Sequence, residues 1–225
     1  MIMLRLRSLS MKILITAGPT REAIDPVRYL TNRSSGKMGY AMAHSAHEFG
    51  HEVTLVSGPT RLEIPPGVNY VPVLTALDMH HAVAKRAKDA DVIICCAAVS
   101  DYRPAEIADQ KIKKTGETLT LELIKNPDIL ADCRPVFGYE GVLVGFAAET
   151  ENLEENARGK LIRKHCDLVV ANDVSGSVGF DTDHNQVLLV YPEHSESLPM
   201  ATKDELADAI IQHCMELAAA RLELN

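Results

Sequence analysis

The sequence lacks several features that would each point to a particular class of protein. It has no run of about 20 apolar residues, which a helix needs to span a bilayer, so we expect no membrane contact. Its 23 basic residues are outnumbered by 31 acidic ones, and the net charge of −8 argues against a general nucleic-acid-binding protein. Its five cysteines form no CxxC pair. This argues against a disulfide framework or a zinc site and favours reduced thiols in the cytoplasm.

The first residues, MIMLRLRSLS, do not have the pattern of a secretory signal. Arg5 and Arg7 interrupt the apolar residues, and no small-residue cleavage site follows. Met11 stands directly before an apolar run and is a possible alternative start. We therefore expect residues 1–11 to be a dispensable extension and residues 12–225 to form one domain.

Short apolar segments alternate with helical patterns along most of the chain. Nearly continuous apolar runs are typical of strands buried on both faces of a parallel sheet, and they occur at 12–17, 52–57, 91–98, 141–148 and 167–173. A weaker strand pattern lies at 69–73. Helical patterns occur at about 36–49, 76–89, 154–164 and 203–222. The alternation predicts an α/β fold, a Rossmann-like three-layer domain with a mostly parallel sheet.

Two segments break this alternation. Residues 101–127 form a long polar excursion with one alternating stretch, TLTLELI at 118–124, which predicts a strand with one covered face. Such an excursion is usually a lid, a flap or a subunit contact. Residues 174–199 begin irregularly and continue as a pattern that predicts an extra hairpin at the sheet edge.

The stretch TNRSSGKMG begins like a phosphate loop but fits neither common pattern. Thr31 and Met38 replace the first and last residues of a Walker motif, and GKMG supplies only half of a dinucleotide fingerprint. The segment still leads into a helix whose first amides have no partner within the helix, which favours an anion. The alternative is plain N-capping by Ser34 or Ser35. We favour a phosphate site, because Gly36 and Gly39 would otherwise weaken the helix start.

Several charged residues allow two interpretations. Asp101 follows a predicted strand, where ligands bind in open α/β sheets. Lys160 and Lys164 lie one helical turn apart and could bind a triphosphate or complement the helix dipole. His44, His47 and His51 could bind a metal, but we favour a solvated helix face. The residues alone therefore indicate an α/β protein that binds a phosphorylated ligand, with a nucleotide favoured.

Six segments, taken in order, resemble the bacterial phosphopantothenoylcysteine synthetases. They are ITAGPTREAIDPVRYLTNRSSGKMG, AAVSDYRP, KIKK, IKNPDIL, VGFAAET and LVVANDVS. The resemblance runs from about residue 12 to residue 181. In many bacteria this domain follows a flavin-dependent decarboxylase. That partner is missing from this sequence, so the resemblance implies a stand-alone synthetase without flavin.

The resemblance implies a reaction in coenzyme A biosynthesis. The carboxylate of 4′-phosphopantothenate attacks the α-phosphorus of CTP, which gives an acyl-cytidylate and pyrophosphate. The amine of L-cysteine then displaces CMP to form 4′-phosphopantothenoyl-L-cysteine. Mg²⁺ accompanies CTP, and no protein side chain can be named as its direct ligand. The family is cytoplasmic and homodimeric, and the excursion at 101–127 corresponds to its flap and dimer contact. Eukaryotic relatives use ATP, and no single residue decides between the two nucleotides.

The resemblance also assigns roles to individual residues. Asn32 and Lys111 correspond to the catalytic residues, with Asn32 donating to an oxygen near the reacting carbonyl and Lys111 acting on the α-phosphate from the flap, in its own subunit or across the dimer. Ala97, Ala98 and Asp101, with Asn32, correspond to substrate contacts. The nucleotide-binding set comprises Ser34, Gly36, Gly39, Asp101, Lys111, Pro127, Phe146, Lys160, Lys164 and Asn172.

Two other functions remain as alternatives. An NAD(P)-dependent Rossmann-type reductase is disfavoured by the missing fingerprint and by EVTLVSGP, which ends without an acidic residue. A non-catalytic nucleotide sensor would need neither a lysine flap nor a polar asparagine loop.

Overall fold

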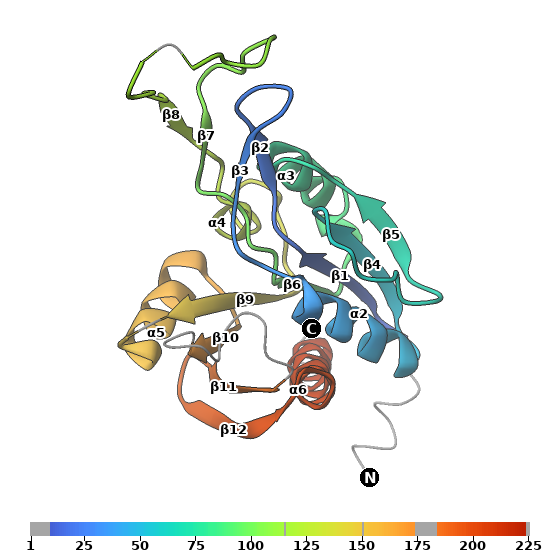
Figure 1. Ribbon diagram of the computed structural model, residues 1–225. Coiled ribbons are helices and arrows are strands. Elements are labelled where there is room, and N and C mark those ends of the chain that lie inside the picture. The colour runs from blue at the N-terminus through green and yellow to red at the C-terminus, as the bar shows by residue number, and fades with distance from the viewer. Residues whose placement is uncertain (1–9, 115, 150, 174–183, 224–225) are drawn as a thin grey trace.

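A central sheet crosses the molecule in the computed structural model, and helices cover both of its faces (Figure 1). The structure describes residues 10–114, 116–149, 151–173 and 184–223. The sheet strands are β1 (Lys12–Ala17), β4 (Glu52–Ser57), β5 (Asn69–Pro72), β6 (Val92–Cys95), β9 (Val142–Glu149), β10 (Leu168–Asp173), β11 (His184–Val190) and β12 (Ser195–Thr202). The helices are α2 (Lys37–Glu48), α3 (Ala76–Ala84), α4 (Ile129–Asp132), α5 (Leu153–Lys164), α6 (Lys203–Glu223) and the short 3₁₀ helix η1 (Ala87–Asp89).

The order of the strands places β1 at the point where the chain changes direction. The eight strands follow the order β12-β11-β10-β9-β6-β1-β4-β5, and the neighbours from β5 to β10 are parallel. The chain adds β4 and β5 on one side of β1 and then returns to add β6, β9 and β10 on the other. Ligands of such sheets bind at the carboxyl ends of the two strands where this reversal occurs. The predicted α/β fold with a mostly parallel sheet is confirmed.

The last two strands form the predicted edge hairpin. β10 pairs with β11 and β11 pairs with β12, in both cases antiparallel. Of the irregular part predicted at SGSVGFDTDHN (175–185), residues 175–183 lie outside the described residues, and His184 and Asn185 belong to β11.

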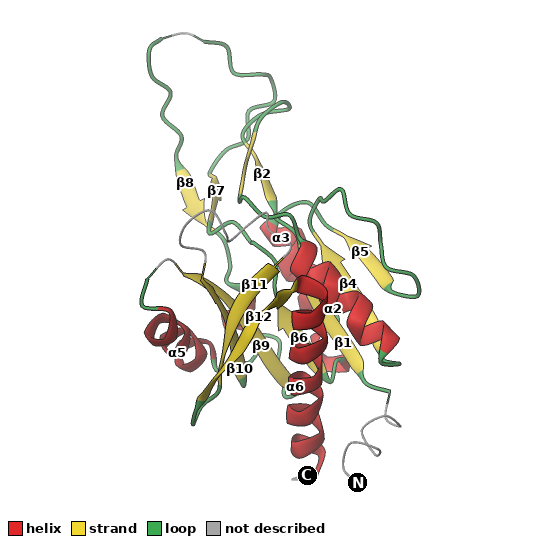
Figure 2. Ribbon diagram, turned by 60° about the horizontal axis from the view of Figure 1, so that its bottom comes forward, coloured by secondary structure: helices red, strands yellow, loops and turns green. Residues whose placement is uncertain are grey.

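The core lies on both faces of the sheet because successive side chains of a strand point to opposite sides. Ile13 and Ile15 of β1 pack with α2 and α6, which lie next to each other on one face (Figure 2). Leu14, between them in sequence, packs with α3, α4 and α5 on the other face. The layers are therefore helix, sheet and helix, as the continuous apolar runs predicted.

Two predicted strands are shorter than their sequence patterns. The strand expected at 91–98 ends at Cys95, because the chain then turns toward β1: the Ala97 amide donates to Thr16 Oγ1 and the Ala98 amide to the carbonyl of Gly18. The strand expected at 118–124 is wrong for most of its length. Only β8 (Leu123–Lys125) forms, paired with β7 (Tyr102–Pro104). A two-stranded ribbon without a covering layer is marginal, so the rest of the alternating stretch stays irregular.

A second small hairpin was not predicted. β2 (Arg21–Ala23) pairs with β3 (Tyr29–Thr31), between β1 and α2. We call this unit the β2–β3 hairpin, and we use "flap" for the excursion at 101–127. Both extend from the same end of the molecule (Figures 1 and 2).

Met11 and His51 join the beginning of the described chain to the core. Met11 is buried, its amide donates to His51 Nδ1 at 3.3 Å, and its carbonyl accepts from the Glu52 amide. Residues 1–9 of the expected extension lie outside the described residues, and a truncation should keep Met11. The interpretation of His51 as part of a solvated helix face is wrong, because the chain turns after Gly50 and buries the ring.

His51 should make the free energy of unfolding decrease as the pH is lowered. Burial lowers the pKa of His51 below its ordinary value, so the unfolded chain binds more protons than the folded chain below about pH 6.5. We expect His51→Asn, whose amide oxygen can still accept from Met11, to be less stable at neutral pH and to lose less stability between pH 7 and 5. Urea unfolding at several pH values measures this. His44→Asn, an exposed change on α2, should retain the wild-type slope, and parallel wild-type and His51→Asn curves would contradict the prediction.

Candidate functional site

Two adjoining cavities open at the carboxyl ends of the strands beside the chain reversal. The α2 cavity, of about 280 Å³, is lined by residues 34–39, 96–99 and 146–148 together with Lys160, Asn172, Asn185, Val187 and Lys203. The α4 cavity, of about 330 Å³, is lined by residues 99–101 and 125–130 together with Thr16, Cys95, Ala97, Phe146, Lys160, Arg163 and Lys164.

The two cavities share one wall. Ala97, Val99, Phe146 and Lys160 line both of them. The Lys160 ammonium group donates to the carbonyl of Phe146, so the end of β9 and helix α5 are joined at this wall. Two ligands that occupy the two cavities would therefore meet beside Lys160.

The charge of the cavities is opposite in sign to that of the whole chain. Among the described residues, the lining of the α2 cavity contains Lys37, Lys160 and Lys203 and no carboxylate. The α4 cavity contains four basic side chains against the carboxylates of Asp101 and Asp128. Concave sites lined by one sign of charge concentrate the field, so both cavities suit anionic ligands despite the net charge of −8.

The start of α2 is shaped by close packing against β1. Gly36 has φ 79° and precedes the first helical residue, and this conformation favours glycine. A Cβ on Gly39 would lie 2.5 Å from the Cβ of Ala17. The two glycines thus let the helix start approach the end of β1. This packing is a structural reason for both glycines, beside the phosphate site that we predicted from them.

Asn32 holds the wall that the cavities share. It follows β3, and its amide nitrogen donates to the carbonyls of Ala98 (3.2 Å) and Val99 (3.1 Å). The side chain itself lines neither cavity. We expected its amide group to donate to a ligand oxygen. In the structure both protons of that group are directed to protein carbonyls, and the amide oxygen is the atom that remains to accept.

Lys164 and Asp128 form an ion pair at the α4 cavity. Lys164 Nζ lies 2.5 Å from Asp128 Oδ2, and Asp128 caps α4 by accepting from the Ala131 amide at 3.0 Å. Burial raises the pKa of Asp128, but the hydrogen bonds from Lys164 and Ala131 outweigh it and the pKa is lowered. The carboxylate therefore stays charged and keeps the lysine at the cavity.

Two residues of the cavity linings each have a buried oxygen atom without a hydrogen-bond partner in the described part of the chain. These atoms are Ser100 Oγ, in a residue that lines the α4 cavity, and Asn172 Oδ1, in a residue that lines the α2 cavity. An unsatisfied buried polar group costs about 1–3 kcal/mol, so each of these atoms favours a ligand that would hydrogen-bond to it.

The thiols at the site are unsuited to nucleophilic chemistry. The hydrogen bond with Cys133, together with burial, holds the pKa of Cys95 well above its ordinary value, and burial raises the pKa of Cys96 to about 12. The nucleophilic form of cysteine is the thiolate. The arrangement therefore favours chemistry between two bound ligands rather than a covalent intermediate on a cysteine.

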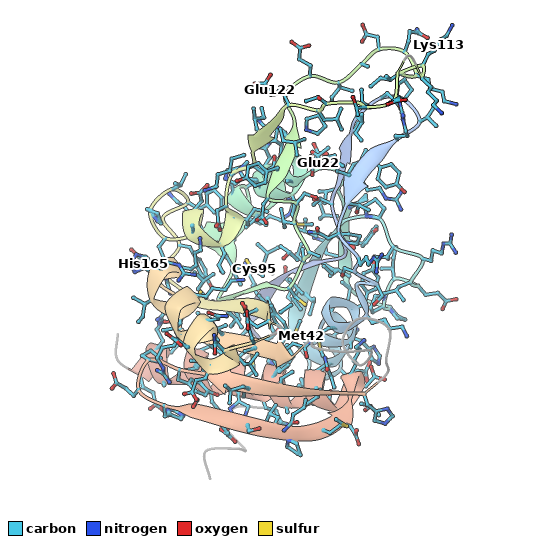
Figure 3. The ribbon with its side chains drawn as sticks, turned by 60° about the vertical axis from the view of Figure 1, so that its left-hand side comes forward. Glu22, Met42, Cys95, Lys113, Glu122 and His165 are labelled. Carbon is cyan, nitrogen blue, oxygen red and sulfur yellow. The ribbon has the colours of Figure 1, made fainter. Side chains whose placement is uncertain are left out.

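Most of the predicted site residues line the cavities, and the exceptions are Asn32, which is bonded to the shared wall, and Lys111. Ser34, Gly36, Gly39, Ala98 and Asn172 line the α2 cavity, Asp101, Pro127 and Lys164 line the α4 cavity, and Ala97, Phe146 and Lys160 line both. Lys111 is exposed on the flap and lines neither cavity. Figure 3 shows its neighbour Lys113 at the far end of the flap, away from Cys95 and Met42 in the body.

Other lining residues were missed from the sequence. Asn185 and Lys203 reach the α2 cavity from the edge strand β11 and from α6, far along the chain. Ser100 and Arg163 line the α4 cavity. Their position beside Asp101 and Lys164 in the same motifs was the available signal.

Within the described residues, no group of three or more histidine, cysteine or acidic side chains is placed to hold a metal ion. The described helices include none that is long and apolar enough to cross a membrane.

The sequence model of one family matches almost the whole chain. This family is the DNA/pantothenate metabolism flavoprotein C-terminal domain, and the match covers residues 9–217. The chain belongs to this family.

The relatives are proteins of coenzyme A biosynthesis. The chain is 52% identical over 203 residues to the coenzyme A biosynthesis bifunctional protein CoaBC of Vibrio cholerae, a match that covers 89% of this chain and 51% of that protein. It is 48% identical over 205 residues to CoaBC of Escherichia coli K12, covering 89% and 50%. The chain thus spans about half the length of these curated relatives.

Solved structures have the same fold. The crystal structure of the C-terminal domain of CoaBC covers 97% of this chain and 100% of its own, with a TM-score of 0.81 and 41% identity. The DNA/pantothenate metabolism flavoprotein of Streptococcus pneumoniae has a TM-score of 0.79 and 28% identity, covering 91% and 98%. The Cab2 mutant H337A, in complex with phosphopantothenate-cysteine, has a TM-score of 0.75 at 18% identity, which supports the fold alone.

Proposed function

We propose that the chain ligates 4′-phosphopantothenate and L-cysteine in a CTP-dependent reaction that proceeds through an acyl-cytidylate. The family match and the relatives in coenzyme A biosynthesis support this assignment. The observation that carries it is the pair of adjoining basic cavities with one shared wall. Two anionic substrates can lie end to end in such a site, with their reacting groups at the shared wall.

The α4 cavity is the proposed nucleotide site. Lys160, Arg163 and Lys164 provide positive charge for a triphosphate, while Asp101, Pro127 and Phe146 complete the lining. Ser100 Oγ provides a further polar group in the same wall. This assignment keeps five of the ten nucleotide-binding residues implied by the family resemblance: Asp101, Pro127, Phe146, Lys160 and Lys164.

The α2 cavity is the proposed site of the phosphopantothenate chain. Ser34, Gly36 and Gly39 surround the start of α2, where backbone amides and the helix dipole favour a phosphate. We therefore assign these three residues, with Asn172, to the second substrate rather than to the nucleotide. The reason is that they line only the α2 cavity, whereas Arg163 and Lys164 of α5 line only the α4 cavity.

The proposed chemistry needs positioning and positive charge rather than a protein nucleophile. The substrate carboxylate attacks the α-phosphorus, and the bond to pyrophosphate breaks. The cysteine amine then attacks the activated carbonyl and CMP leaves. Lys160 at the shared wall, with Lys111 brought in by the flap, would stabilise the charge that develops on the phosphate oxygens. Asn32 would hold the Ala98–Val99 peptide against the reacting groups.

The site fits a Mg²⁺ ion that enters with the nucleotide. Mg²⁺ prefers oxygen ligands and is usually held by substrate phosphates, waters and one or two carboxylates. Asp101 supplies a carboxylate in the α4 cavity, while Asp128 is paired with Lys164. When bound, the ion would neutralise charge on the triphosphate. Neither half-reaction transfers electrons, so the proposed reaction assigns no task to a flavin.

We propose that the protein works in the cytoplasm, where thiols stay reduced. All five cysteines are free in the structure, and three of them are buried.

The reaction is tested by pyrophosphate release from purified protein. We expect release with CTP, Mg²⁺ and 4′-phosphopantothenate, less with ATP, and formation of the ligated product only when L-cysteine is present. Lys111→Gln should slow acyl-cytidylate formation by roughly 10²-fold, because it removes a charge that acts on the transition state. Lys113→Gln, a neutralised lysine two positions away, is the matched control. Wild-type protein that releases no pyrophosphate with either nucleotide would refute the function, and a Lys111→Gln variant at the wild-type rate would refute the residue's role.

Asn32→Asp should impair turnover while the chain stays folded. A carboxylate cannot donate to the carbonyls of Ala98 and Val99 and would repel them, so the shared wall would shift. Misplacing a reacting group by about 1 Å costs roughly 10²-fold in rate. Steady-state kinetics and circular dichroism measure the two effects. Asn69→Asp, at an exposed asparagine of β5, should keep wild-type activity. An Asn32→Asp protein with normal turnover would contradict the role of these two hydrogen bonds.

We propose that the flap is the contact of a homodimer. Five apolar side chains among its described residues are exposed in the single chain: Tyr102 (53%), Ile107 (62%), Leu119 (56%), Leu123 (43%) and Ile124 (38%). Leu123→Asp should raise the dimer dissociation constant by at least roughly tenfold in sedimentation experiments, since burying a charge in an apolar contact is unfavourable. Leu222→Asp, at an equally exposed leucine of α6, should not change it. A monomeric wild-type protein at micromolar concentration would contradict the proposal.

A further inference from the structure

The turn of the β2–β3 hairpin is hydrogen-bonded to the flap at Ile112, the residue next to Lys111. Asp25 lies in this turn and its side chain has no solvent exposure. One carboxylate oxygen accepts from the backbone amides of Val27 (2.9 Å) and Arg28 (2.8 Å), which is enough to close the turn. The other oxygen accepts from the Arg28 side chain and from the backbone amide of Ile112 at 3.1 Å.

Arg28 makes a second bond to the same flap residue. Its Nη2 atom, which lies 2.5 Å from Asp25 Oδ2, also donates to the carbonyl of Ile112 at 3.1 Å. Both backbone groups of Ile112 are thus bound to one ion pair. These bonds are not needed for the turn, since they reach a segment more than 80 residues away in the chain.

A third contact holds the flap on the other side of Lys111. The amide of Ala108 donates to the carbonyl of Ile24 at 3.1 Å. Lys111 therefore lies between two attachment points, at residues 108 and 112. The segments of the hairpin and the flap that make these contacts lie side by side in both ribbon views (Figures 1 and 2).

The hairpin itself is fastened to the body, so it can serve as a fixed reference for the flap. Glu22 of β2 is buried and accepts from the Ala76 amide at the start of α3 at 2.9 Å. The Arg21 amide donates to the carbonyl of Leu74 at 2.8 Å. The same hairpin ends in Asn32, which is bonded to the wall between the cavities.

We propose that Asp25 and Arg28 form a latch that holds the flap at Ile112 and thereby positions Lys111 for the reaction. Neither residue needs to touch a substrate for this. The inference rests on the proposed function, since it is there that Lys111 has its task. It adds that one hairpin places both the flap lysine and the wall held by Asn32.

The geometry of the latch is tested without activity, by hydrogen exchange at the Ile112 amide. Asp25→Asn puts an amide in place of the ionised carboxylate beside Arg28. Arg28→Lys keeps a cation but lacks the planar fork that reaches the Ile112 carbonyl. We expect exchange at Ile112 to be faster by at least roughly tenfold in both variants, with the amides of β1 unchanged. Asp109→Asn, an exposed carboxylate on the same flap, is the matched control. If Asp25→Asn fails to fold, Arg28→Lys decides, and unchanged protection of Ile112 in the folded variants overturns the latch.

Its role in the reaction is tested by a double-mutant cycle with Lys111→Gln. A misplaced Lys111 should slow acyl-cytidylate formation by about tenfold or more in each latch variant, measured in single turnovers, with little change in the KM for CTP. The same substitutions are then made in a protein that already carries Lys111→Gln, and its slow rate of pyrophosphate release is measured. We expect them to lower this rate by less than about twofold, because their effect depends on the lysine that is now absent. Additive losses would overturn the inference, since they would mean that Asp25 and Arg28 act independently of Lys111.

The two proposals fail in different ways. Wild-type protein that releases no pyrophosphate refutes the function and the catalytic part of this inference. An active wild type whose Ile112 amide is unaffected by the latch variants refutes the latch alone.

Discussion

The site depends on the packing of β1 between β4 and β6. The chain leaves β1 in one direction, builds two strands, and returns to place β6 on the other side. The loops after β1 and β6 continue side by side, with Pro19 bridged to Ala98, and both cavities open along the loop after β6. The Ala97 and Ala98 amides bond back to the end of β1, which fixes these two residues in the lining of the cavities. Both cavities are consequences of this arrangement.

Hydrogen bonds to backbone groups hold the irregular segments around this opening. Asn32 holds the carbonyls after β6, Asp25 and Arg28 hold the flap, and Glu22 holds the start of α3. Each of these side chains lies on or beside the β2–β3 hairpin. Segments without regular structure need such partners, because a buried backbone group without one is costly. The hairpin thus connects three parts of the molecule: the loop after β6, the flap and the start of α3.

The strength of the sequence patterns explains which predictions succeeded. KILITA and EVTLVS are buried on both faces, and their boundaries match β1 and β4. TLTLELI also has a regular pattern, in which apolar and polar residues alternate. However, its partner strand β7 is only three residues long and no layer covers the pair, so most of TLTLELI does not form a strand. The β2–β3 hairpin has no apolar pattern at all. Its pairing depends on contacts with the loop at 74 and with the flap, which periodicity cannot show.

Most strands of the central sheet and the helices α2, α3, α5 and α6 followed from the sequence alone, because their patterns depend on neighbours within a few positions. The motifs also identified many residues of the site, and several of these lie directly after a strand or at a helix start. Tertiary structure alone decided that these residues form two cavities with a shared wall. It also decided that Asn32 bonds to protein carbonyls and that Lys111 lies away from the cavities. These are relations between segments up to 169 residues apart, as for Ser34 and Lys203. They are set by how the layers pack and by which buried polar groups must find partners.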